Sequence, residues 1–381
     1  MRSETVKFLQ ALAVLIGTIV GVGTFGIPYA FSRAGFFIGL GYLGVLSLVV
    51  LTLHLIYGEI VLRTHEKHRL IGYAEIYLGT WGKRVASLLM IFGIFGTLLA
   101  YTIVGGTFSK LLFDHFFVLG IGTWSILFFA VMAFFVITDF KTGAPAEVAM
   151  SAVLLTIFVA IIGRALPDIS FSNLSMPSTF HDIFLPYGVI LFSLAGGAAV
   201  PELRDILAGD GKMKRIITIG TLIPALLYAL FALSVVGAFG NTTATDSISS
   251  LASRYGSWMS IAGGLVGILT VATSFIVMGL VLKHAFIYDL KMRRSVAILT
   301  VLTVPLVLFA VSTHDFVKVI SFVGGVLGGV EGVLLLKLHR AARAKGQRQP
   351  EYSLRMPLGV YYVLGTVFAA GIVYEIVFTI G

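Results

Sequence analysis

A glycine-rich interruption in the first hydrophobic stretch constrains this chain more than any other feature. The stretch reads GTIVGVGTFGIP from Gly17 to Pro28. A helix that only spans lipid avoids such a run, because each interior glycine costs about 1 kcal/mol relative to alanine. Backbone groups freed by a break in the helix cannot face hydrocarbon, so they must line a cavity or bind something. The alternative is a helix-packing face of small residues, which the four-residue spacing of Gly17 and Gly21 satisfies.

A second interruption, SLAGGAAVP from Ser193 to Pro201, lies about halfway along the chain. Paired interruptions at corresponding points of two halves are the best sequence indication of a transporter's binding site. This interruption also offers free carbonyl groups and small side chains. Phe192 directly precedes it and is a candidate lid, although a phenylalanine packed in the core or facing lipid is the commoner state. The sequence therefore predicts two broken helices, in spans 1 and 6.

The composition places these interruptions in an all-α, polytopic membrane protein. Of the 381 residues, 58% are hydrophobic and 12% charged, and the mean hydropathy is +1.00. Soluble domains carry about 25% charged residues. Zero cysteines exclude disulfides and thiolate metal sites. Stretches of about 20 apolar residues predict one transmembrane domain over residues 1–381 with eleven spans, at about 6–34, 37–62, 84–113, 121–139, 145–164, 183–207, 214–239, 257–284, 295–311, 316–338 and 357–380.

The distribution of Lys and Arg predicts the orientation. With the N-terminus in the cytoplasm, all but five of the 27 basic residues fall in cytoplasmic segments; the exceptions are Arg33, Lys110, Arg164, Arg254 and Lys318. This asymmetry predicts a cytoplasmic N-terminus and a C-terminus outside. It also explains the net charge of +9 as anchoring to the inner leaflet rather than nucleic-acid binding. The broken spans predict two inverted five-helix repeats, at about 6–164 and 183–338, and an additional helix at about 357–380.

The two interruptions offer the groups that an α-amino acid needs. Peptide N–H groups around Gly21, Val22 and Gly23 can bind a carboxylate at the N-terminal end of a half-helix. Carbonyl groups from Gly17 to Val20 can bind an ammonium group or a small cation. Tyr101, in the middle of span 3, is added for its hydroxyl, with a packing role as an equal alternative. The predicted substrate-binding residues are Thr18, Ile19, Gly21, Val22, Gly23, Thr24, Tyr101, Phe192, Ser193, Ala195 and Gly196.

Span 8 carries Thr270, Thr273 and Ser274 in the segment GILTVATSF. Their spacing places them on one helix face. Two hydroxyls and a carbonyl on that face are hard oxygen ligands of the kind that suits Na⁺. The alternative is a set of hydroxyls that bond back to their own helix.

Acidic residues inside the membrane are few, and each is a candidate proton site. Glu331 lies in span 10 and Glu375 in span 11, while Glu59 and Glu202 lie near cytoplasmic span ends. Charges at the inner mouth also predict a gate, in which Arg2 or Lys7 of span 1 pairs with Asp289 of span 8. An exposed ion pair contributes only about 0–1 kcal/mol, so such a gate would open readily. Unrelated juxtamembrane charges are the alternative.

Three segments resemble the amino acid/auxin permease and aromatic amino acid permease group of the amino acid–polyamine–organocation superfamily. They are GTIVGVGTFGIPYAFSRAG (17–35), LFSLAGGAAVPEL (191–203) and LTVATSFIVMGLVLKHAFIYDL (269–290). The resemblance implies the leucine-transporter-like fold, with substrate bound between spans 1, 3, 6 and 8. It also implies a sodium position formed by the carbonyls of Gly17, Val20 and Thr270 and the hydroxyls of Thr273 and Ser274. Span 6 departs from many relatives by carrying Gly196 and Gly197 in place of a bulkier residue, which leaves the substrate size open.

We therefore expect a secondary amino acid transporter of the plasma or inner membrane, working by alternating access and coupled to Na⁺ or H⁺ with no other cofactor. Spans 1, 2, 6 and 7 would rock against spans 3, 4, 8 and 9. The sequence contains no GxxxxGK[ST] or HExxH segment, and its acids are scattered, so we do not expect an enzyme. A channel or a nutrient-sensing receptor on the same fold is the alternative. The expected partners are the amino acid and the lipid bilayer, with neither nucleic acid nor an obligate protein partner.

Overall fold

The computed structural model describes the chain apart from residues 1, 141–143, 175–178, 180, 208–210 and 378–381. Its regular structure, over this described part, is entirely helical. Eight of the described helical segments are long and apolar enough to cross a membrane, and Glu4–Ile19 with Val22–Ala34 forms a further span bent by 48°. These features confirm an all-α membrane fold, while the count of eleven spans and the inverted repeats remain predictions.

The first predicted span comprises α1 (Arg2–Ile19), the 3₁₀ turn η1 (Val22–Gly26) and α2 (Ile27–Ala34). The sixth comprises η4 (His181–Phe184), α7 (Leu185–Ser193), the 3₁₀ turn η5 (Gly197–Ala199) and α8 (Val200–Leu207). The remaining helices are α3 (Phe36–Arg63), α4 (Leu70–Phe113), α5 (Ile121–Ile137), α6 (Ala144–Ala165), α9 (Met213–Phe239), α10 (Ile248–Tyr255), α11 (Ser257–His284), α12 (Arg294–Val311), α13 (Phe316–Phe322), α14 (Gly329–Lys345) and α15 (Leu358–Glu375). Two π-helical turns, η7 (Ala285–Asp289) and η8 (Val323–Gly328), continue α11 and precede α14.

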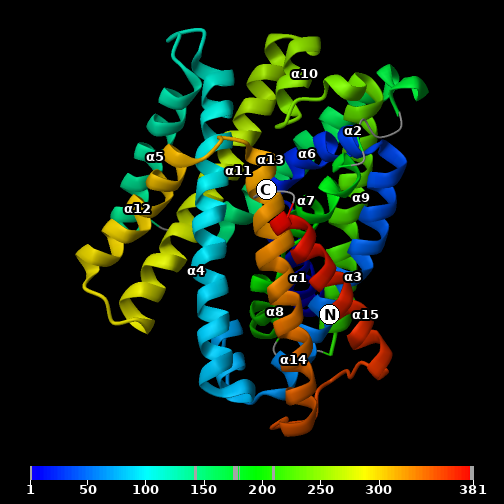
Figure 1. Ribbon diagram of the computed structural model, residues 1–381, viewed down its shortest axis with the longest axis vertical. Coiled ribbons are helices and arrows are strands. Elements are labelled where there is room, and N and C mark those ends of the chain that lie inside the picture. Colours follow the sequence, from blue (N-terminus) through cyan, green and yellow to red (C-terminus); the bar gives the residue numbers. More distant parts are fainter. Residues whose placement is uncertain (1, 141–143, 175–178, 180, 208–210, 378–381) are drawn as a thin grey trace.

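The helices form two packed groups (Figure 1). The first group, which we call the bundle, consists of α1, α2, α3, α7, α8 and α9, which pack against one another. The second group, which we call the scaffold, consists of α4, α5, α11 and α12. Helices α13 and α14 contact members of both groups. The bundle corresponds to predicted spans 1, 2, 6 and 7 and the scaffold to spans 3, 4, 8 and 9.

Two polar segments between the predicted spans form helices that the hydropathy pattern did not predict. Helix α4 begins at Leu70, well before the predicted third span, and bends at Gly79. The φ angle of Gly79 is +70°, in the left-handed region that favours glycine. The short helix α10 lies in the polar segment between α9 and α11. Amphipathic pieces of this kind carry too few apolar residues to be recognised by a hydropathy window.

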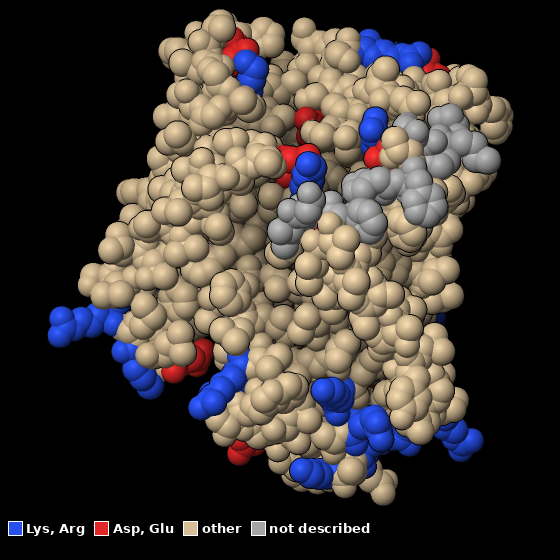
Figure 2. Space-filling model, in the orientation of Figure 1, with Lys and Arg blue, Asp and Glu red and all other residues tan. Residues whose placement is uncertain are grey.

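Lys and Arg gather at one end of the molecule, which we call the basic end, along the lower edge of Figure 2. At the opposite end, basic side chains lie beside acids: Arg33 and Asp182 at 3.5 Å, Lys110 and Asp114 at 3.0 Å, Arg164 and Asp168 at 3.4 Å. The excess of positive charge is therefore at one end, as the positive-inside rule requires of a cytoplasmic face. Which end faces the cytoplasm stays a prediction.

Candidate functional site

The first broken helix exposes two peptide donors. Helix α1 ends at Ile19 and η1 begins at Val22, so Val20 and Gly21 lie outside any helix. The N–H of Gly21 donates to the Ile19 carbonyl at 2.8 Å, so this predicted free donor is in fact used within the break. Among the described residues, the N–H groups of Val22 and Gly23 meet no backbone acceptor. These two donors remain available to a ligand carboxylate.

The same break exposes acceptors on its other side. The carbonyl groups of Gly17, Thr18 and Val20 accept no backbone hydrogen bond within the described part of the chain. They are left free because the helix stops before the N–H groups that would have reached them. The Thr18 hydroxyl donates to the Val14 carbonyl at 2.8 Å, so it is turned toward its own helix. The break therefore offers donors and acceptors a few residues apart, as predicted for a zwitterion.

The second broken helix offers acceptors in turn. Helix α7 ends at Ser193, and the chain is irregular until η5 begins at Gly197. The carbonyl groups of Leu194 and Ala195 accept no backbone hydrogen bond from a described residue. Small side chains flank them, as the sequence SLAGGAA requires.

His54 of α3 positions this second break. The Gly196 N–H donates to its Nε2 at 3.4 Å, and its Nδ1 lies 3.0 Å from the Thr221 hydroxyl of α9. Since Nε2 accepts, the ring is neutral and carries its proton on Nδ1, where it donates to Thr221. His54 is therefore a buried hydrogen-bonding residue that links α3 and α9 to the break between α7 and α8.

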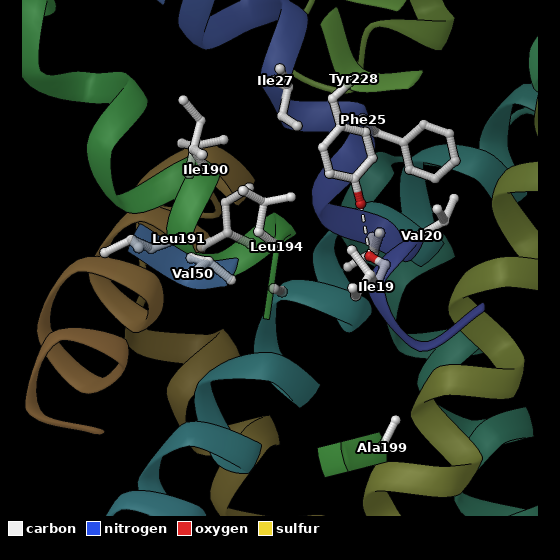
Figure 3. Packing of buried hydrophobic residues seen from close by; sticks show 14 of the residues in the cluster. Ile19, Val20, Phe25, Ile27, Val50, Ile190, Leu191, Leu194, Ala199 and Tyr228 are labelled. Atoms are coloured by element: carbon white, nitrogen blue, oxygen red, sulfur yellow. Dashed lines mark hydrogen bonds between the residues drawn. The ribbon is translucent and has the colours of Figure 1, made fainter. Parts of the chain in front are cut away.

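Tyr228 of α9 joins the two breaks, and the sequence analysis missed it. This fully buried side chain places its hydroxyl 2.7 Å from the Ile19 carbonyl and 3.0 Å from the Ser193 carbonyl. Figure 3 shows the hydroxyl aimed at Ile19, with Phe25 beside the ring. One side chain thus holds the ends of α1 and α7 together. The available signal was a lone tyrosine in the apolar span, because a buried tyrosine hydroxyl needs a partner.

The two breaks pack directly against each other at two glycines, Gly23 and Gly196. A Cβ at Gly23 would lie 2.5 Å from the Ser193 Oγ and 2.8 Å from its Cα, and one at Gly196 would lie 2.3 Å from Ile19 Cγ1. No side chain fits at either position. Around Gly21, by contrast, the nearest atom to an added Cβ is the Ile19 carbonyl oxygen, at 4.0 Å.

Aromatic residues seal the breaks on the side away from the basic end. The Phe25 ring lies 5.0 Å from Phe108 and 5.5 Å from Phe158, which lies 5.1 Å from Phe231. All four side chains are buried. The Ser247 hydroxyl, before α10, donates to the Phe25 carbonyl at 2.6 Å and ties the end loop onto η1.

Several residues of the two breaks are exposed. Thr18, Ala195 and Ala198 are exposed, and Gly21 and Gly197 are partly exposed. Helices α1 and α8 lead from the breaks to the basic end (Figure 1). The structure therefore seals the breaks with aromatic side chains on one side and leaves several of their residues exposed elsewhere.

Two of the predicted cation residues of α11, Thr270 and Thr273, bond to their own helix. The Thr270 hydroxyl donates to the Val266 carbonyl at 2.7 Å, and the Thr273 hydroxyl donates to the Leu269 carbonyl at 2.8 Å. This is the alternative arrangement considered above, and it leaves the hydroxyl lone pairs available. Helix α11 packs against η1. No cluster of three His, Asp or Glu suited to a metal occurs among the described residues, so a cation here would bind carbonyls and hydroxyls.

Tyr101 and Phe192 lie beside the breaks. Tyr101 is buried on α4, and its side chain interacts with Ser274 of α11, next to the predicted cation residues. Phe192 is partly buried, and its Cδ1 would lie 3.0 Å from a Cβ on Gly23. Thr24 is completely buried on η1.

The predicted gate is not closed in this state. The Arg2 side chain lies outside the described residues. Lys7 is partly buried and Asp289, in η7, is exposed, and neither makes an ion pair with another described residue. The gate therefore stays a prediction for a state closed at the basic end.

Comparison with known proteins places this geometry in context. The model of the tryptophan/tyrosine permease family matches residues 4–378. The tyrosine-specific transport system 1 of Haemophilus influenzae is 25% identical over 391 residues, covering 96% of each chain. The glutamine transporter 2 of Aliivibrio fischeri is 20% identical over 339 residues, covering 84% of this chain and 85% of that protein.

Two solved structures share the fold. The crystal structure of MhsT in complex with L-phenylalanine matches with a TM-score of 0.68 and 14% identity, over 98% of both chains. The inward-facing conformation of Mhp1 matches with a TM-score of 0.68 and 12% identity, over 98% of this chain and 89% of that one. Both likenesses support the expected leucine-transporter-like fold.

Proposed function

Because the chain belongs to the tryptophan/tyrosine permease family, we propose that it carries an aromatic amino acid across the membrane by alternating access, coupled to Na⁺. Membership of this permease family makes it an amino acid transporter rather than an enzyme. The substrate, the coupling ion and the orientation are the finer parts of the proposal.

One observation carries the proposed binding mode: two helices break at the same depth and leave peptide groups free where they meet. The N–H groups of Val22 and Gly23 bind the substrate carboxylate, with the half-helix dipole adding to the attraction. The carbonyl groups of Leu194 and Ala195 receive the ammonium group. Every backbone group left unsatisfied in a membrane costs free energy, so a ligand that satisfies several binds well.

The substrate side chain occupies the second break. Ala195, Gly197 and Ala198 carry little or no side chain, Ala195 and Ala198 are exposed, and a Cβ added at Gly197 would meet no atom closer than 3.7 Å. This room supports a bulky substrate, and a relative is described as a tyrosine-specific transport system. L-tyrosine is therefore the first substrate to test.

Sodium binds between α1 and α11. Its ligands are the free carbonyls of Gly17 and Val20, the Thr270 carbonyl, and the lone pairs of the Thr273 and Ser274 hydroxyls. Such a site ties the moving bundle to the scaffold. An ion can shift the equilibrium only if it binds the two states unequally. Coupling to H⁺ in place of Na⁺ is the alternative.

We assign the basic end to the cytoplasm, following the positive-inside rule. With that assignment, the aromatic seal around Phe25 lies toward the outside of the breaks. Lys7 or Arg2 would pair with Asp289 when that inner mouth closes.

Uptake of radiolabelled L-tyrosine into proteoliposomes tests the proposal. We expect accumulation against the tyrosine gradient when an inward Na⁺ gradient is imposed, whereas a channel would only equilibrate tyrosine. Thr273→Ala with Ser274→Ala should abolish the Na⁺ dependence. Thr300→Ala is the matched control, because that hydroxyl of α12 also bonds back to its own helix, at the Val296 carbonyl.

Two results would count against this account. Failure to accumulate tyrosine, phenylalanine or tryptophan under any ion gradient would contradict the substrate class. Unchanged Na⁺ dependence in the double variant would remove the cation assignment and leave the transport function standing.

A further inference from the structure

The acids predicted as proton sites differ sharply in their surroundings. Glu59, on α3, is fully buried and fully partnered at the basic end. Its carboxylate accepts from Arg63 Nε at 2.8 Å, from Ser353 Oγ at 3.0 Å and from the Leu354 N–H at 2.7 Å, and it lies 3.0 Å from His339 Nε2. This network fastens the segment before α15 onto α3 and α14. A carboxylate with so many donors is held ionised and is structural.

Two further acids also have surroundings that explain them. Glu375 accepts from the Ser321 hydroxyl at 2.7 Å, between α15 and α13. Glu202 is exposed, with its carboxylate 3.6 Å from Arg69. Glu331 differs from both, since no described residue gives its carboxyl a hydrogen bond or an ion pair. It is the acid of the four that the structure leaves unexplained.

Glu331 faces the second break. It lies in the first turn of α14, directly after the π-helical turn η8, which packs on α7. Its Oε1 is 3.8 Å from the position that a Cβ on Gly197 would take, and the Tyr57 ring of α3 borders the same position at 3.7 Å. Gly197 is the first residue of η5, which leads into α8. Glu331 as a residue is partly exposed, like Gly197.

The backbone opposite Glu331 is suited to a carboxylate. The N–H groups of Gly197 and Ala198 have no backbone partner among the described residues, and they lie at the positive end of the half-helix α8. In the present state they make no hydrogen bond to Glu331. A carboxylate without partners inside a membrane protein costs considerable free energy, so the neutral acid is favoured here. Closer approach of η5 would reverse this preference by supplying N–H donors.

The neighbouring groups do not offer another source of charge. The titratable side chain beside Glu331 is Tyr57 of α3, with Tyr73 of α4 and Arg69 beyond it. No charged residue of the described part acts directly on the carboxyl from α8, α13 or α15. A metal would need further oxygen ligands, whereas a proton needs only this one carboxyl.

We propose that Glu331 is a proton-binding site whose protonation is linked to opening of the basic end. In the open state the carboxyl holds a proton taken from water at that end. When η5 and α8 close onto Glu331, the proton leaves to water and the carboxylate accepts from the Gly197 and Ala198 N–H groups. Protons therefore favour the open state, since linkage requires unequal affinity for the two states. The inference rests on the proposed function only in taking α8 as a part that moves.

The absence of cysteine from the sequence allows a direct test. Ala198→Cys, at an exposed position of η5, is introduced into the full chain in proteoliposomes, and its labelling rate with a membrane-impermeant maleimide is measured across pH. The reference is Glu66→Cys, at a side chain that is 82% exposed, because thiol reactivity itself changes with pH. The ratio of the two rates reports the opening at the second break.

We expect this ratio to increase as the pH falls. Glu331→Gln should keep the ratio at its low-pH level at every pH, because glutamine resembles the protonated acid in shape and charge. Glu331→Asp should retain a pH response, which separates proton binding from damage to packing. Glu375→Gln, at the other intramembrane acid, should respond as the parent does.

A pH response that persists in Glu331→Gln, or that Glu375→Gln abolishes equally, would overturn the assignment. The labelling needs no substrate, so it is independent of the transport experiment. Absence of tyrosine uptake with an intact labelling response would contradict the proposed function alone. Normal uptake with a labelling ratio that does not change with pH would contradict the proton site alone.

Discussion

The two breaks share a backbone design but differ in their surroundings. In the first, Val22 and Gly23 are buried, next in sequence to Phe25 of the aromatic seal. In the second, Ala195 and Ala198 are exposed, and a carboxyl from α14 faces the chain. A broken helix supplies unsatisfied peptide groups in both cases. Which of them holds a ligand and which moves is decided by the neighbouring helices.

Under the proposed function, this difference gives the two breaks different roles in binding the substrate. Val22 and Gly23 of the first break are buried among packed side chains, so their N–H groups can fix a charged group of a substrate with little reorganisation. Ala195 and Ala198 of the second break are exposed, so under the proposed function this break accommodates a substrate side chain and shifts as α8 moves. Tyr228 links the two breaks, because its hydroxyl donates to the carbonyl of Ile19 at the end of α1 and to that of Ser193 at the end of α7.

The largest expected effect comes from filling the contact between the breaks. Gly23→Ala would place a methyl group 2.8 Å from the Ser193 Cα, which only a backbone shift can relieve. Overpacking of this kind costs about 1–3 kcal/mol, and it would also displace the free N–H groups. We expect a clear drop in melting temperature and loss of tyrosine uptake.

Gly21→Ala is the matched control in the same break. The φ angle of Gly21 is −123°, which any residue adopts, and an added Cβ there has space. The variant should melt within a degree or so of the parent, since surface-like substitutions change stability by about 0.5 kcal/mol or less. Equal damage from the two substitutions would show that the contact at Gly23 is not what sets the distance between the breaks.

A smaller effect is expected when the bridge between the breaks is removed. Tyr228→Phe keeps the ring and deletes the hydroxyl, which leaves the buried Ser193 carbonyl without this donor, while the Ile19 carbonyl keeps the Gly21 N–H. An unsatisfied buried group costs about 1–3 kcal/mol. We expect lower thermal stability and weaker tyrosine binding, with Tyr362→Phe, at an exposed position of α15, as the control. A variant that binds tyrosine as tightly as the parent would show that the breaks do not depend on this bridge.

The sequence predicted the breaks because their cause is local. Runs of glycine and a closing proline end α1 at Ile19 and α7 at Ser193, within the predicted segments. Whether a particular peptide group is free is decided by finer geometry, and the Gly21 N–H is used by a tight turn to Ile19.

The side chains that hydrogen-bond to the two breaks could not be predicted from the sequence in the same way. Tyr228 meets a carbonyl 209 residues away and His54 an N–H 142 residues away, and no local pattern encodes such pairings. The exposure that distinguishes the two sides of the breaks is likewise a property of the packed molecule. Composition gave the membrane class, but the helices in polar segments, such as α10, required the coordinates.

The central claim is that free peptide groups at the meeting of two broken helices bind both charged groups of an amino acid. Thermal stabilisation of the purified protein by L-tyrosine, by tyramine, which lacks the carboxylate, and by phloretic acid, which lacks the amine, tests it most directly. We predict that L-tyrosine alone raises the melting temperature appreciably. Equal stabilisation by tyramine or by phloretic acid would contradict the claim, because one of the two sets of peptide groups would then contribute nothing to binding.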